Sequence, residues 1–133
     1  MCAMPFLPMS NGNFISKNMN IEDARIYCLS KQGATEDFPF DEWVLVFRVE
    51  NKIFACVNLQ DVLWFCVKCN PDRAIELRDK YPQITPAWHW NKKYWNQLDI
   101  EQLPDALVCE LIDHSYDEVL KKLPRKIREK YGR

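Results

Sequence analysis

The sequence predicts an α+β domain in which helices pack on an antiparallel sheet. Short apolar runs with strand-like alternation lie between residues 43 and 69 and are separated by short polar turns. Helix-capping patterns at Asn20 and Asn70 stand on either side of these runs. A stripe of apolar residues at helical spacing follows position 103. The predicted order is helix, three strands, helix, two strands, helix, or α-β(3)-α-β(2)-α, which is typical of the α+β class.

Length and composition fit one domain with an ordinary hydrophobic core, because 47% of the 133 residues are hydrophobic. We place this domain at residues 20–133 and expect residues 1–19 to form a loosely ordered N-terminal leader. The leader lacks the basic segment of a signal peptide, and no apolar run approaches the ~20 residues that a membrane span requires. The sequence therefore predicts a cytoplasmic protein with no membrane partner, which we expect to be a monomer or a weak homodimer.

The first helix is predicted from residue 20 to about residue 31. Asn20 is the expected N-cap, and the acid Asp23 completes a capping-box pattern. Gly33 is the expected stop.

Residues 34–42 are expected to form a polar loop. Within it, we expect the rings of Phe38 and Phe40 to fill a gap beside the sheet, because exposed pairs of phenylalanines are disfavoured.

An antiparallel meander is predicted next, with strands at residues 43–49, 53–59 and 63–69. Three polar residues interrupt faces that are otherwise apolar and mark the part of the sheet expected to reach solvent: Arg48, Asn58 and Lys68.

Asn70 and Pro71 begin the second helix, which is predicted to end near Lys80. An irregular extended segment follows, then a β-hairpin with arms at residues 87–90 and 94–100. The last helix is predicted from residue 103 to about residue 123.

The six cysteines fall mostly within apolar periodic segments, as buried thiols do. Cys66 and Cys69 form a CxxC sequence, but residues three apart on a strand point to opposite faces. A second CxxC, which a zinc ribbon requires, is absent from the sequence. We therefore predict no metal site, no redox site and no cofactor.

The predicted hairpin carries the chemistry most suited to nucleic acid. Lysines at its tip suit phosphates, asparagines suit base edges or sugars, and tryptophans suit stacking on bases: Asn91, Lys92, Lys93, Asn96 and the residues Trp88, Trp90 and Trp95. A structural alternative is that the tryptophans are core residues and that the lysines keep the tip soluble.

Charge is distributed unevenly along a chain whose net charge is −1 and whose pI is near 6.1. The last 13 residues, 121–133, hold seven bases and one acid. This pattern fits a basic tail that contacts an acidic partner, and it also fits a solvated helix end. The near-neutral total opposes a dedicated DNA-binding domain, which usually has a basic balance.

Four segments in this order resemble the MmcQ/YjbR family of small bacterial proteins. They are Phe38-Pro39-Phe40, Val67-Lys68-Cys69-Asn70-Pro71, His89-Trp90-Asn91-Lys92-Lys93-Tyr94-Trp95-Asn96, and Asp113-His114-Ser115-Tyr116 with Leu123-Pro124-Arg125-Lys126. The resemblance covers about residues 20–130 and implies a fold related in shape to the secretion chaperones and to frataxin. It also implies a double-wing DNA-binding motif. This sequence departs from the family where Tyr94 replaces a frequent histidine and where Asn70 replaces a usual aspartate.

Three functions follow as hypotheses. The first is DNA binding, with nine contact residues expected: Lys68, Arg73, Asn91, Lys92, Lys93, Trp95, Asn96, Arg125 and Lys126. The second is a module without catalytic activity that binds a protein or a small ligand. The third is an enzyme, which we disfavour because the sequence has no Gly-rich phosphate loop, nucleophile elbow or metal-spaced histidine pair. A contiguous positive face around the Lys92–Lys93 tip would favour nucleic acid, and interrupting acids would favour a protein partner.

Overall fold

A computed structural model describes residues 19–60, 64–88 and 90–133. The expected leader lies outside these ranges except for Met19. This side chain is 2% exposed and packs in the main hydrophobic core.

The described residues form one antiparallel sheet with α-helices on it. The strands are β1 (Ala34–Asp37), β2 (Val44–Val49), β3 (Lys52–Asn58), β4 (Phe65–Lys68), β5 (Ile84–Pro86) and β6 (Trp95–Leu98). The helices are α1 (Ile21–Leu29), α2 (Pro71–Lys80), α3 (Asp105–Leu120) and α4 (Arg125–Arg128), with short 3-10 turns at Ile100–Gln102 and Glu129–Tyr131. The strand order across the sheet is β1-β2-β3-β4-β6-β5, which confirms the predicted α+β class.

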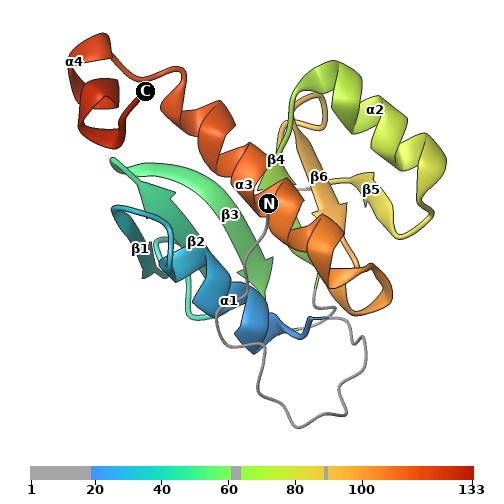
Figure 1. Ribbon diagram of the computed structural model, residues 1–133. Coiled ribbons are helices and arrows are strands. Elements are labelled where there is room, and N and C mark those ends of the chain that lie inside the picture. Colours follow the sequence, from blue (N-terminus) through green and yellow to red (C-terminus); the bar gives the residue numbers. More distant parts are fainter. Residues whose placement is uncertain (1–18, 61–63, 89) are drawn as a thin grey trace, which may run out of the picture.

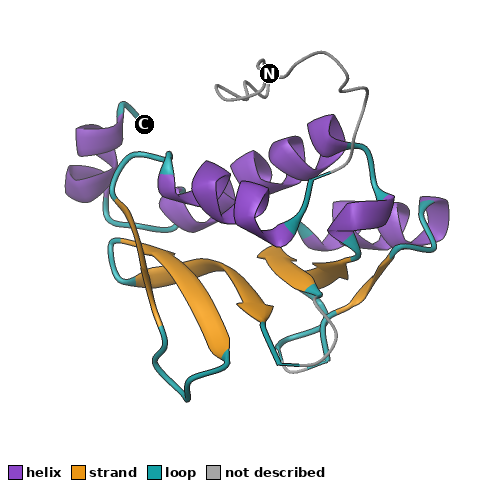
Figure 2. Cartoon of the chain, turned by 90° about the horizontal axis from the view of Figure 1, so that it is seen from below, coloured by secondary structure: helices purple, strands orange, loops and turns teal. Residues whose placement is uncertain are grey.

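The two faces of the sheet have different surroundings. Helices α1, α2 and α3 lie on one side of it, and α3 runs across its middle (Figures 1 and 2). Residues that pair directly across strands share a face. One such row lies under the helices and is buried in the main core: Leu45, Val57, Phe65, Leu98 and Ile84. The next row points to the opposite side, which we call the open face.

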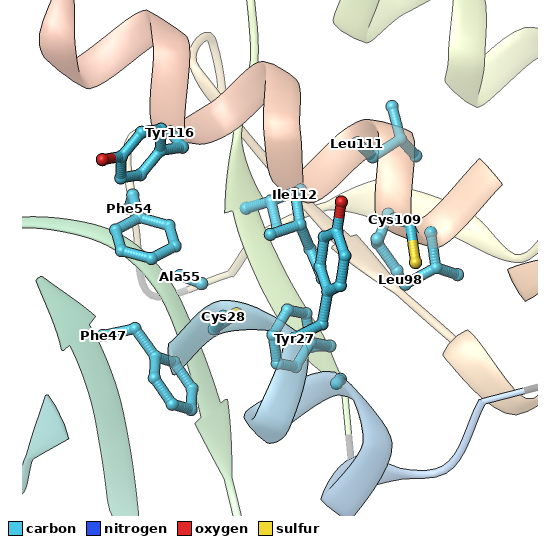
Figure 3. Close-up of a cluster of buried hydrophobic side chains, with 14 of the residues drawn as sticks. Tyr27, Cys28, Phe47, Phe54, Ala55, Leu98, Cys109, Leu111, Ile112 and Tyr116 are labelled. Carbon is cyan, nitrogen blue, oxygen red and sulfur yellow. The ribbon is translucent and has the colours of Figure 1, made fainter. Parts of the chain in front are cut away.

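The main core joins α1 and α3 to the strands beneath them. Figure 3 shows Tyr27 and Cys28 of α1 and Ile112 of α3 in one cluster with Phe47 and Ala55 of the sheet. At one side of this cluster, the rings of Phe54 and Tyr116 meet edge to face with centroids 5.4 Å apart. All of these side chains are buried, so this interface supplies the hydrophobic stabilisation of the helix layer.

The sequence motif Asp113-His114-Ser115-Tyr116 fastens α3 to its neighbours. Asp113 accepts hydrogen bonds from the Tyr27 hydroxyl at 2.8 Å and from Lys31 Nζ at 2.6 Å. His114 Nε2 accepts from the Asn70 backbone N–H at 3.1 Å, Ser115 bonds to two strands, and Tyr116 donates to the Gln32 carbonyl at 2.5 Å. Each residue of the motif thus ties α3 to another part of the fold, so the motif has a structural role.

Helix starts agree with the capping patterns in the sequence. Asn20 Oδ1 accepts from the Asp23 N–H at 2.8 Å, and the Asp23 carboxylate accepts from the Asn20 N–H. Asn70 caps α2 by accepting from the Asp72 and Arg73 N–H groups at 3.0 and 3.2 Å, with Pro71 at the first helical position.

Two expectations about the strands are wrong. Residues 34–37 form edge strand β1 instead of a loop, because pairing with β2 satisfies their backbone although their side chains are polar. The first arm of the hairpin is β5 at 84–86, earlier than the expected residues 87–90. Pro86 is tolerated there because β5 is an edge strand.

Candidate nucleic-acid interface

The open face carries a row of small and polar side chains across five strands. Cross-strand pairing places them side by side in the order Val46, Cys56, Cys66, Gln97 and Thr85. The row after it holds Lys68 opposite Trp95. The helices cover the other side of the sheet (Figure 2). On this side, Val46, Cys56 and Cys66 are buried in a second, smaller hydrophobic cluster.

A cavity of about 810 Å³, which we call the aromatic pocket, lies on the open face. Its floor comes from the sheet and its walls from aromatic side chains of the surrounding loops; the lining residues are Phe40, Val44, Cys56, Asn58, Trp64, Cys66, Thr85, Pro86, Trp88, Trp90 and Gln97. The volume lies in the range of small-molecule sites, roughly 300 to 1,000 Å³.

Two rings at the rim of the pocket are open to solvent. Trp88 is 67% exposed and Phe40 is 63% exposed. Trp90 is partly buried: its ring centroid lies 4.8 Å from that of Trp95 beneath it and 6.4 Å from that of Phe40. The expectation that Phe38 and Phe40 fill a gap beside the sheet is therefore wrong, because both are exposed.

Beside the aromatic pocket lies a second hollow of about 480 Å³, which we call the basic cleft. Trp90 lines both cavities and separates them. The cleft lies between the β2–β3 turn and the C-terminal end of α3, and its charged lining residues are all cationic: Arg48, Lys52, Lys68 and Lys122.

The pKa of Lys68 is lowered by its position in the basic cleft. Burial lowers the pKa of Lys68, and the neighbouring Lys122 and Lys52 lower it further, whereas Glu118 acts in the opposite direction. Glu118 is already engaged with Lys121 Nζ at 2.8 Å. An anion in the cleft would relieve the repulsion among these lysines.

The loop between β5 and β6 brings two more lysines beside the cleft. Asn91 Oδ1 accepts from the Lys93 N–H at 3.0 Å and fixes a turn that leaves both Lys92 and Lys93 exposed. Lys92 Nζ lies 5.0 Å from the ring centroid of Trp88. Lys93 Nζ and Lys122 Nζ lie 5.6 and 5.7 Å from the ring of Tyr94, so Tyr94 joins the tip to the basic cleft.

Two expected contact residues are largely buried, although Trp95 lines the basic cleft opposite Lys68. Trp95 is buried beneath Trp90. Asn96 is 1% exposed, accepts from Arg78 Nε at 2.6 Å and donates to the Ala74 carbonyl at 3.4 Å. Its side chain therefore points toward α2, away from the open face.

Other expected cations lie away from the tip or are neutralised. Arg73 makes two hydrogen bonds to Glu110, at 2.8 and 2.5 Å, and these bonds lower the pKa of the Glu110 carboxyl. Arg125 pairs with Glu129 at 3.4 Å. Lys126 is exposed on α4. Of the nine expected contact residues, the structure brings together Lys68, Asn91, Lys92, Lys93 and the largely buried Trp95.

The thiols of the pocket floor are poor nucleophiles. A hydrogen bond with Cys66, followed by burial, raises the pKa of Cys56 strongly. Cys66 packs on the open face, whereas Cys69 packs in the main core, as the alternation of the strand predicts. Among the described residues, no group of three or more histidines, cysteines or acids is placed to hold a metal ion.

Sequence reasoning missed most of the pocket. It did not single out Lys52, Thr85 or Gln97, it named Lys122 only as part of the basic tail, and it treated Cys56 and Cys66 only as buried thiols, because the sequence does not show which of these residues meet in the fold. One signal did exist: Arg48, Asn58 and Lys68 interrupt apolar strands, and all three line one of the two cavities.

The geometry defines an α+β domain with one helix-covered sheet face and one open, ligand-accessible face. Comparison with known proteins gives the family. The model described as YjbR matches residues 29–118, and the chain belongs to this family. None of the helices within the described ranges has the length and apolarity to cross a membrane.

The chain is similar to the uncharacterised protein YjbR of Escherichia coli, with 29% identity over 113 residues, 84% of this chain and 96% of that protein. It is also similar to the uncharacterised Escherichia coli protein YbdF, with 31% identity over 91 residues, 67% of this chain and 75% of that protein. A Deinococcus radiodurans protein with a domain called DUF419 superposes with a TM-score of 0.78 at 35% identity, covering 85% of this chain and 88% of its own. A Pseudomonas syringae protein superposes with a TM-score of 0.66 at 26% identity, covering 75% of this chain and 98% of its own.

Proposed function

We propose that this protein binds nucleic acid on the open face of its sheet, without catalytic activity. One observation supports this proposal most strongly: five lysines gather along one edge of the open face and, among the described residues, make no ion pair. We call them the basic strip; they are Lys52, Lys68, Lys122, Lys93 and Lys92.

The lysines of the basic strip differ from many other cations of the chain because they have no carboxylate partner among the described residues. Many other cations already have a carboxylate partner, including Arg25, Lys31, Arg73, Lys121 and Arg133. The chain therefore carries a local positive surface although its net charge is −1. A nucleic acid that binds such a surface releases its condensed counterions, which increases the affinity. The lysines can contact phosphates of any sequence.

Fluorescence anisotropy with a labelled oligonucleotide at low salt tests the proposal. We expect Lys52→Ala/Lys122→Ala and Lys92→Ala/Lys93→Ala to weaken binding and to reduce its dependence on salt. For a single strand, each lost phosphate contact lowers the slope of log Kobs against log salt by about 0.7. The control is Lys80→Ala/Lys130→Ala, which removes the same charge from exposed positions outside the strip and also gives up the 3.9 Å ion pair of Lys130 with Glu50.

The proposal fails if the control weakens binding as much as the strip variants do, since charge alone would then explain the effect. It also fails if the wild-type protein does not bind above the non-specific micromolar range at low salt.

A small-ligand module is the second candidate, and the aromatic pocket favours it. A cavity of about 810 Å³ with apolar walls and a few polar groups is a general feature of ligand sites. Dependence of affinity on oligonucleotide length separates the two functions, because a small-ligand site gains nothing from additional nucleotides.

A further inference from the structure

The aromatic pocket and the basic cleft share one wall, and their chemistries are complementary. Trp90 lines both, with aromatic and polar side chains on one side and lysines on the other. A ligand that occupies both must combine a flat apolar group with an anion close to it.

The floor of the aromatic pocket contains polar side chains that favour a ligand with hydrogen-bond donors and acceptors. Gln97 is 7% exposed, and its carboxamide has no hydrogen-bond partner among the described residues. Thr85 also lines the floor, but its Oγ1 is fully buried and is therefore closed to a ligand in this conformation. Asn58 Oδ1 accepts from the Gln60 N–H at 2.9 Å, and no residue in the described ranges accepts from its amide N–H groups.

Polar groups at the base of a cavity lose their hydrogen bonds to water when a ligand enters, so they favour a ligand that replaces those bonds. A purely apolar ligand, such as an acyl chain, would leave these groups unpaired. A heterocycle with donors and acceptors on its edge would satisfy them, and its flat faces suit the aromatic walls.

The walls offer stacking surfaces that the domain uses only in part: Lys92 Nζ lies 5.0 Å from the ring centroid of Trp88, and the ring centroid of Phe40 lies 6.4 Å from that of Trp90. The exposed rings of Trp88 and Phe40 stand at the rim, and Trp90 has its lower face against Trp95. Base–aromatic stacking of this kind tolerates any base, because every base has a π face.

From these features we infer that the open face binds single-stranded nucleic acid, with an unpaired base in the aromatic pocket and its phosphates along the basic strip. This inference rests on the proposed nucleic-acid binding and adds the form of the ligand. In a duplex the faces of the bases are stacked on one another, so a paired base reaches such a pocket only after it is flipped out.

The test compares a short labelled oligothymidine with a blunt duplex of the same length. Pocket variants are Trp88→Ala, which removes a stacking surface, and Gln97→Leu, which removes the floor amide while retaining similar volume. Trp43→Ala is the matched control, because Trp43 is a partly exposed tryptophan that does not line the pocket. Thermal melting of each variant checks that the fold is intact.

We expect the single strand to bind more tightly than the duplex. Trp88→Ala should weaken single-strand binding about 5- to 150-fold, the range that loss of one stacked base produces. Gln97→Leu should also weaken it, and Trp43→Ala should bind as the wild type does.

Equal affinity for both probes, with pocket variants that bind like the wild type, would overturn the inference while leaving the proposed function intact. Failure of the proposed function looks different, because Lys52→Ala/Lys122→Ala would then bind both probes as the wild type does. Binding of thymidine monophosphate as tightly as the oligomer would also overturn the inference, since the pocket would then be a site for free nucleotides.

Discussion

Replacing Ser115 with alanine should destabilise the protein far more than loss of one hydroxyl normally does. Ser115 is 0% exposed. Its Oγ accepts from the Lys68 N–H at 2.8 Å and donates to the Phe54 carbonyl at 2.5 Å. The direct pairing of β3 with β4 ends at Ala55 and Val67, so the hydroxyl bridges the two strands where they separate.

The expected magnitude follows from the two backbone groups that lose their partner. Each buried group left without a hydrogen bond costs about 1–3 kcal/mol. We therefore expect Ser115→Ala to lower the free energy of unfolding by about 2–6 kcal/mol. Urea denaturation measures this change as a lower midpoint with an unchanged m value.

Ser30→Ala is the matched control. Ser30 Oγ donates to the Tyr27 carbonyl at 2.6 Å, but this carbonyl also accepts from the Ser30 N–H at 3.1 Å. It keeps a partner in the variant, so the expected loss is below about 1 kcal/mol. A loss below about 0.5 kcal/mol in Ser115→Ala would refute the bridging role, because two orphaned buried groups cannot cost so little.

Two further predictions concern residues of the sequence motifs. Burial, followed by the charge of Arg73, lowers the pKa of His114, whose neutral Nε2 accepts the Asn70 N–H. The stability contributed by neutral His114 is present above the ordinary imidazole pKa of about 6.5 and is lost as pH falls toward the lower folded pKa. Denaturation at pH values on both sides of this range should therefore show a smaller pH dependence in His114→Gln than in the wild type. Asn96→Leu should lower the free energy of unfolding by about 1–3 kcal/mol, because the Arg78 side chain and a buried carbonyl lose a partner. The folded fraction of this variant, separated by gel filtration, should bind oligonucleotide as the wild type does. Weaker binding would indicate that Asn96 contacts the nucleic acid.

Features that depend on neighbouring residues in the chain were predictable from the sequence. The caps at Asn20 and Asn70 and the alternation of β2, β3 and β4 are local patterns, and the structure has them within a few residues of the predicted positions. Strand β1 was missed because Ala34-Thr35-Glu36-Asp37 has no apolar alternation. Its backbone becomes a strand through pairing with β2, which is a tertiary effect.

The binding face was harder to predict for a similar reason. Alternation alone shows that neighbouring strand residues point to opposite faces, but it does not show which face the helices cover. Trp95 and Asn96 were both expected to contact DNA, whereas the structure buries Trp95 under Trp90 and turns Asn96 toward α2. Lys52 and Lys122 are 70 positions apart in the sequence and meet only in the folded protein.

Nuclear magnetic resonance of the tryptophan indole N–H groups tests most directly whether the open face is the binding face. The five tryptophans give one indole signal each, and Trp64, Trp88 and Trp90 line the aromatic pocket while Trp43 does not. During titration with oligothymidine, we expect the signals of Trp64, Trp88 and Trp90 to shift or broaden and that of Trp43 to stay in place. Unchanged pocket signals alongside shifts in amides of the helix-covered side, such as those of α1, would contradict the account.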